Sequence, residues 1–112
     1  MKEYKLYFKE LLIGLIKLID GDFPNVYGEF VKSQNVLPEN ILNYINYSIK
    51  ADEIWEKSEE EWEAFMLVNE INFIDLIESE DWYLVDENGL REKIVIPNFC
   101  KDGVVLKWDF RK

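Results

Sequence analysis

The sequence predicts an α+β fold in which N-terminal helices pack on a C-terminal three-stranded antiparallel β-meander. Up to residue 80 the apolar residues recur at helical spacing, whereas from Asp81 onward they alternate with polar ones. An Asn88-Gly89 pair also stands between two apolar runs, which is a strong signal for a β-hairpin. We therefore expect residues 1–112 to form a single domain, with 1–80 mainly helical and 81–112 in antiparallel strands.

The first helix is predicted over residues 3–19. At 100° per residue its polar side carries most of the charged side chains, and Leu6 and Ile13 fall among them. We expect these two residues to contact either the core or a partner. The predicted buried stripe consists of Tyr4, Phe8, Leu11, Leu12, Leu15, Leu18 and Ile19.

Two further helices are predicted before residue 58. A turn at 20–25 leads into a short helix over 24–33, because proline suits the first helical turn. Pro38 opens a second helix in the same way. The apolar face of that second helix carries Ile41, Leu42, Ile45 and Ile49.

The last helix is predicted to begin at Ser58. Ser58 followed by Glu61 matches a capping box, in which the serine side chain accepts from a backbone N–H of the first turn. Asn69 stands where an apolar residue is expected, so the segment is predicted to kink there or to form two helices. Its buried stripe is predicted to hold Trp62, Phe65, Met66, Phe73, Leu76 and Ile77.

Three strands complete the predicted fold, over residues 82–86, 91–96 and 104–110. A turn at 87–89 joins the first two, and Asp102-Gly103 supplies the second turn. Apolar and charged residues alternate along the last strand, which predicts one buried and one exposed face.

The negative charge is concentrated in one segment. The net charge of the chain is −10, and residues 58–92 contain twelve acidic groups against Arg91 as the single basic one. Such a field repels nucleic-acid phosphates and attracts cations. Contact with nucleic acid is therefore disfavoured, and a basic partner is favoured.

The chain is predicted to be cytoplasmic. Its lone Cys100 cannot form an intramolecular disulfide, which favours a reducing compartment. Lysines precede an apolar run over 11–16, but the run is too short to span a bilayer and no small-residue cleavage site follows. We expect no targeting segment and no membrane association.

Nothing in the sequence indicates an enzyme or a cofactor. The absence of histidine removes the commonest general base and most zinc sites. Asp20-x-Asp22 begins like a calcium loop, but the required glycine and glutamate are replaced by Asn25 and Val31. Cys100 lacks a histidine partner and is interpreted as a semi-buried small residue. We therefore predict no catalytic residue, metal or cofactor.

A partner-binding surface is predicted on the acidic segment. Exposed helix faces commonly carry Lys or Arg four residues from Glu, and no basic residue occurs between Glu59 and Glu87. A solvated face that only confers solubility is the alternative interpretation. Trp55, which has acidic neighbours on both sides in the sequence, is either an interface anchor or a packing residue. The predicted binding residues are Trp55, Glu59, Glu60, Glu63, Glu70, Glu78, Glu80, Asp81, Asp86 and Glu87.

The chain resembles the small acidic immunity proteins of bacterial contact-dependent inhibition and other polymorphic toxin systems. The resemblance is one of type over the whole chain, and it is most apparent over residues 82–89, over 94–99 and at Trp108. It implies a non-enzymatic inhibitor that binds a basic toxin domain, such as a nuclease, in a one-to-one complex. The alternatives are a phage or mobile-element DNA mimic that inhibits a host defence protein, and an assembly or adaptor subunit.

Overall fold

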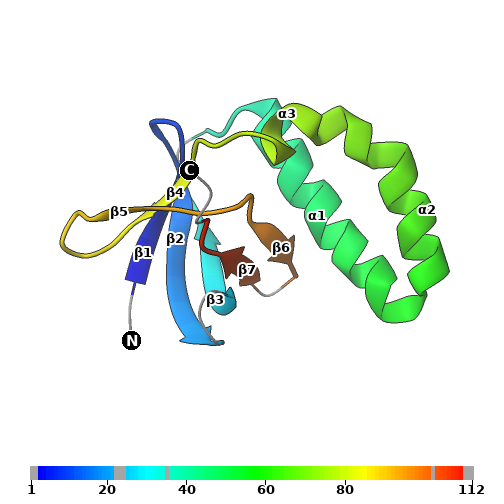
Figure 1. Cartoon of the computed structure of the whole chain (residues 1–112), viewed down its shortest axis with the longest axis horizontal. Helices are drawn as coiled ribbons and strands as arrows, with labels where there is room; N and C mark the ends of the chain where they lie inside the picture. Colours follow the sequence, from blue (N-terminus) through cyan, green and yellow to red (C-terminus); the bar gives the residue numbers. More distant parts are fainter. Residues whose placement is uncertain (1–2, 22–24, 35, 102, 110–112) are drawn as a thin grey trace.

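A computed structural model describes residues 3–21, 25–34, 36–101 and 103–109. This part of the chain forms a seven-stranded antiparallel sheet, with the helices inserted between the third and fourth strands (Figure 1). The elements are β1 (Glu3–Phe8), β2 (Leu11–Asp20), β3 (Asn25–Lys32), α1 (Glu39–Lys57), α2 (Glu59–Asn69), η1 (Glu70–Phe73), α3 (Ile74–Ile77), β4 (Trp82–Val85), β5 (Arg91–Lys93), β6 (Asn98–Cys100) and β7 (Gly103–Lys107).

The predicted helix over 3–19 is wrong, because this segment forms the β1–β2 hairpin. Leu6 and Ile13, which did not fit the helical stripe, are fully buried. Leu15 and Ile19, which did fit it, are half-exposed. Apolar residues are so frequent here that they satisfy a helical stripe, while the strand alternation decides which side chains enter the core. The hairpin turns at Lys9 without a glycine or asparagine to signal it.

The predicted short helix over 24–33 is also wrong. Asn25–Lys32 forms β3, which pairs with β2 on one side and with β7 on the other. Glycine at position 28 allows close approach, because a Cβ there would lie 2.9 Å from the Lys17 carbonyl oxygen on β2. Residues 22–24 and Asp102, in two of the predicted turns, lie outside the described residues.

The predicted C-terminal meander is corrected by the strand order, β5-β4-β1-β2-β3-β7-β6. β4–β5 and β6–β7 form separate hairpins, and β1, β2 and β3 lie between them. Pairing with these N-terminal strands satisfies backbone groups that a short meander would leave unpaired. The residues that follow β5 also reach the end of β7, since Ile94 bridges Trp108 and Val95 N–H donates to the Lys107 carbonyl at 2.9 Å.

Two local predictions in this region are confirmed. β4 and β5 form a hairpin, and Gly89 adopts a φ of 84° in its connection. The Asp86 carboxylate accepts from the backbone N–H groups of Asn88 and Leu90 at 2.8 and 2.9 Å. Along β7 and into Trp108, buried and exposed side chains alternate as predicted.

One hydrophobic core joins the sheet to α1. The α1 residues Ile41, Tyr44 and Ile45 belong to the same buried cluster as the strand residues. Trp82 is fully buried, and its indole N–H donates to the Leu76 carbonyl at 3.0 Å. The strand contribution includes Leu6, Ile13, Ile16, Leu84, Ile94, Phe99, Val104 and Leu106.

Side chains of α1 occupy the outer edge of β6. The Ser48 hydroxyl accepts from Phe99 N–H at 2.7 Å and donates to the Phe99 carbonyl at 3.1 Å. The Tyr44 hydroxyl donates to the Pro97 carbonyl at 2.7 Å. These bonds take the place of a neighbouring strand, so this edge does not offer a free ladder for β-pairing.

The helix start at Ser58 and the break near Asn69 are confirmed. The Ser58 hydroxyl accepts from Glu61 N–H at 3.3 Å. α2 ends at Asn69, whose side-chain amide donates to the Phe65 carbonyl at 2.9 Å, and η1 follows. α2 lies on the side of α1 remote from the sheet (Figure 1), and none of its residues is buried. The helical hairpin therefore presents one side of α2 to solvent.

Candidate protein-interaction site

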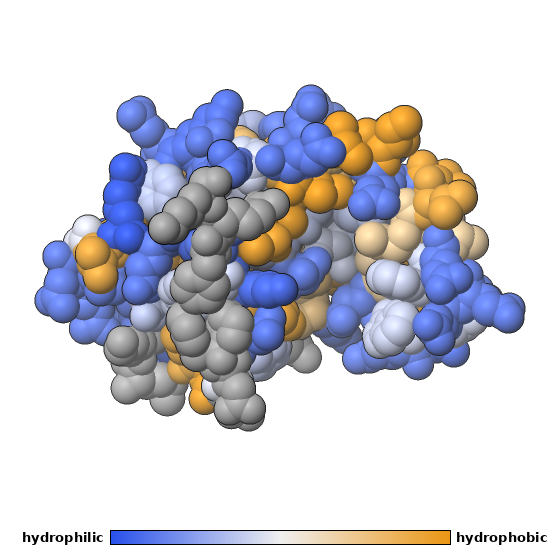
Figure 2. Space-filling model, in the orientation of Figure 1, coloured by the Kyte–Doolittle hydropathy of each residue, from blue (hydrophilic) through white to orange (hydrophobic). Residues whose placement is uncertain are grey.

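The outer side of α2 exposes large apolar residues. The exposed fractions are 84% for Leu67, 72% for Val68 and 74% for Ile71 in the following η1. We call these three residues the apolar strip. Figure 2 shows apolar surface over the upper end of α2 and the adjoining segment. Contiguous exposed apolar surface on a small protein is typical of an interaction site.

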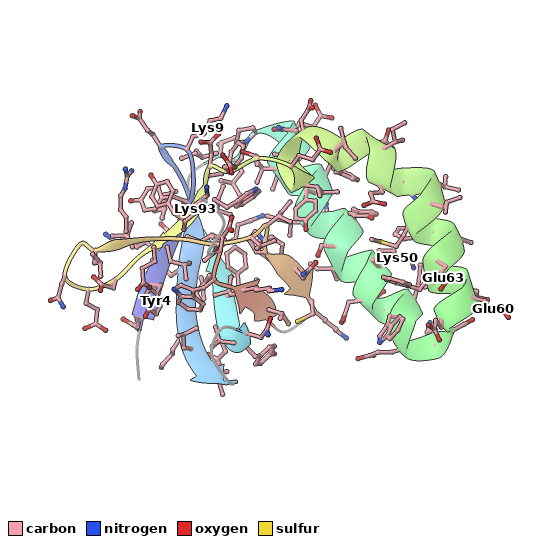
Figure 3. The ribbon with its side chains drawn as sticks, viewed as in Figure 1. Tyr4, Lys9, Lys50, Glu60, Glu63 and Lys93 are labelled. Atoms are coloured by element: carbon pink, nitrogen blue, oxygen red, sulfur yellow. The ribbon has the colours of Figure 1, made fainter. Side chains whose placement is uncertain are left out.

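A row of carboxylates borders this strip. At 100° per residue Glu59 and Glu63 project between the inner side of α2 and Leu67, and Glu70 continues the same line at the helix end. We call these three residues the acidic row. All three are exposed, as is Glu60, which projects away from α1 (Figure 3). The structure thus places four of the predicted binding residues on α2 and η1, and Glu63 and Glu70 are the two that lie next to the apolar strip.

A cavity of about 410 Å³ lies on the other side of the acidic row, between α1, α2 and the β6–β7 hairpin. Trp55 lines it and is half-exposed. Its ring meets that of Trp62 edge to face, with 4.9 Å between the ring centroids. The structure therefore places Trp55 at the mouth of a cavity beside the acidic helix.

The remaining predicted carboxylates do not share the surface of α2. Asp86 and Glu87 lie in the β4–β5 connection, at the opposite end of the molecule from α2 (Figure 1). Asp86 has a structural role in that turn, and the Glu87 carboxylate accepts from Glu3 N–H at 3.3 Å.

Glu78, Glu80 and Asp81 lie between α3 and β4 and are exposed. Glu80 forms an ion pair with Lys93 at 3.4 Å. The Asp81 carboxylate accepts from the Ser79 hydroxyl at 3.2 Å, and its backbone carbonyl accepts from Lys9 N–H. The carboxylates of Glu80 and Asp81 therefore have local partners within the fold.

The described residues form neither a metal-ligand cluster nor a membrane-spanning helix. In residues 3–21, 25–34, 36–101 and 103–109, no three Cys, Asp or Glu side chains converge as metal ligands. Within the same ranges, no helix has the length and apolar character needed to cross a bilayer. Cys100 is half-buried at the end of β6 and lines the 410 Å³ cavity.

The apolar strip was not predicted from the sequence, although a signal for it was present. The predicted stripe of the last helix already contained Trp62, Phe65 and Met66, which face α1. Leu67 and Val68 fall outside that stripe on the helix. Apolar residues in excess of one stripe on a helix indicate a second contact surface.

No protein family, curated protein or solved structure matches this chain.

Proposed function

We propose that this chain is a non-enzymatic inhibitor that binds a basic protein partner through the outer side of α2, in the manner of an immunity protein against a bacterial toxin domain. The observation that supports this proposal is the apolar strip beside the acidic row on a helix without buried residues. An interface with an apolar centre and a charged rim combines slow dissociation with fast, steered association.

The apolar strip favours this function over DNA mimicry. A surface that imitates DNA would present regularly spaced charges, whereas Leu67, Val68 and Ile71 interrupt the carboxylates of α2. An assembly subunit would also use an apolar strip, but it would not need the adjoining acidic row. The combination of the two surfaces points to a basic protein.

The first test concerns the charges. Glu63→Lys together with Glu70→Lys should weaken binding to the partner by at least about tenfold at low salt, and the loss should shrink at high salt. The matched control is Glu3→Lys with Glu87→Lys, which makes the same charge change at the opposite end of the molecule. The proposal expects the neighbouring gene to encode a toxin domain, and this domain is purified and titrated at two ionic strengths. Equal losses in the two double variants would show that only the net charge of the chain matters and would contradict docking on α2, and unchanged affinity would assign the charge to solubility alone.

The second test concerns the apolar strip. Burying a large aliphatic side chain contributes roughly 1.5–3 kcal/mol, so Leu67→Ser with Ile71→Ser should raise the Kd by about 100-fold or more. Both residues are exposed, so thermal stability should change by only about 0.5 kcal/mol per substitution. Unchanged affinity for the same toxin domain, with the fold intact, would contradict docking on α2.

A further inference from the structure

The cavity beside α2 has aromatic walls with accessible ring surface. Trp55 on α1 and Trp62 on α2 meet at an interplanar angle of 74°, so their indole rings form a corner. Tyr47 lines the same cavity, but its ring stacks on Phe65 and Phe73 at 5.5 and 4.6 Å. The two indoles are therefore the rings that a ligand reaches most readily.

The charged groups of the cavity are negative. Asp52 stands one helical turn before Trp55 on α1, and Glu70 lies at the end of α2. Burial and the nearby Glu70 carboxylate together raise the pKa of Tyr47, which keeps its hydroxyl neutral. Among the described residues that line the cavity, none is basic. No lining group thus neutralises the two carboxylates.

We infer that this cavity receives an arginine side chain, whose guanidinium group stacks in the Trp55–Trp62 corner and faces Asp52, while Glu70 adds negative potential from the other end of the cavity. A planar, weakly hydrated cation suits an indole face better than the compact, strongly hydrated ammonium of lysine. A carboxylate near the ring adds charge complementarity.

The arginine belongs to the basic partner, and this assignment rests on the proposed function. Met66 and Glu70 line the cavity, and Leu67 and Ile71 follow them immediately in the chain. One partner could therefore cover the apolar strip and insert a side chain past the acidic row. The cavity itself is tested on the isolated chain, so its test does not depend on that partner.

The probe is N-acetyl-argininamide, titrated into the ¹⁵N-labelled chain at constant ionic strength. The indole N–H signals of Trp55 and Trp62 should shift in a saturable manner. Those of Trp82 and Trp108 should not, because they donate to Leu76 and Glu92 inside the fold. N-acetyl-citrullinamide, which has the same shape without the charge, should produce no saturable shift.

Two variants test the walls. Trp55→Leu removes the indole face, and Asp52→Asn removes one carboxylate, so each should raise the half-saturation concentration about threefold or more. Glu39→Gln removes the same charge from the exposed start of α1 and should leave binding unchanged.

Equal shifts with the arginine and citrulline derivatives would overturn the inference, because shape alone would then account for binding. Saturation by choline at a lower concentration than the arginine derivative would also overturn it, in favour of a small quaternary ammonium ligand. If the arginine derivative binds as expected but the Glu63 and Glu70 double variant retains full affinity for the toxin domain, the proposed function fails and the cation site stands.

Discussion

Ser48 shows how a single side chain fixes the position of a helix against a strand. It is buried, and its hydroxyl both accepts from and donates to the backbone of Phe99. Ser48→Ala would leave these buried groups without that partner, which costs about 1–3 kcal/mol in the free energy of unfolding. Urea denaturation measures this loss. Asn43→Ala, at an exposed position on the same helix, is the control, and equal effects of the two substitutions would contradict the role of Ser48.

Tyr44 is predicted to make the fold sensitive to alkaline pH. Burial raises its pKa well above the ordinary value of 10.0, so the folded chain holds this proton more tightly than the unfolded chain. The stabilisation is fully present below pH 10 and is lost as the pH rises above it. The free energy of unfolding, measured in urea, should therefore fall between pH 10 and about pH 11.5.

Tyr44→Phe is the matched variant for this pH dependence. It should be less stable at neutral pH, because the hydrogen bond to Pro97 is lost. Above pH 10, the free energy of unfolding of this variant should fall less steeply than that of the original chain. Some decline should remain, because the pKa of Tyr47 is raised as well. Parallel declines in the two proteins would rule out Tyr44 as the titrating group.

At the scale of elements, α2 differs from the central strands of the sheet in its lack of buried residues. It packs on α1 through the ring contacts Trp62 with Trp55 and Phe65 with Tyr47. β1, β2 and β4, by contrast, supply fully buried core side chains. An element with few buried apolar contacts opens at a lower free energy than the core.

We therefore expect amide hydrogens of α2 to exchange about tenfold or more faster than those of β1 and β4 under native conditions. Hydrogen exchange followed by NMR measures both in one sample. Ser58→Ala removes the helix cap and should accelerate exchange in α2 further, with little effect on the strands. Protection of residues 59–69 equal to that of Leu84 would show that α2 opens only with the whole fold.

At the scale of the whole molecule, the net charge of −10 opposes compaction. Lys93 pairs with Glu80, but the sequence has no basic residue between Glu59 and Glu87. Salt screens such repulsion, so Tm should rise by a few degrees, about 2–5 °C, between 20 and 500 mM NaCl. Calorimetric or spectroscopic melting measures Tm at both salt concentrations. Glu60→Gln with Glu63→Gln should show a smaller rise, and a Tm that falls with salt would contradict net repulsion.

The sequence by itself determined the features that depend on local chemistry. The β4–β5 hairpin follows from Asn88-Gly89, because few residues other than glycine adopt a positive φ at low cost. The start of α2 follows from the Ser58 cap, and the faces of β7 follow from alternation. The concentration of negative charge in residues 58–92 was also apparent from composition, although its function stays a prediction.

Only the tertiary structure decided whether the N-terminal segment forms a helix or strands. Residues 3–20 are apolar enough to satisfy both a helical and a strand pattern, and pairing of β1 with β4 and of β3 with β7 selects the strands. Tertiary packing likewise placed Trp55 beside Trp62 and separated Asp86 and Glu87 from the acidic row. The physical reason is that strand pairing and helix packing join residues distant in sequence, and a local pattern carries no information about which distant segment will supply the partner.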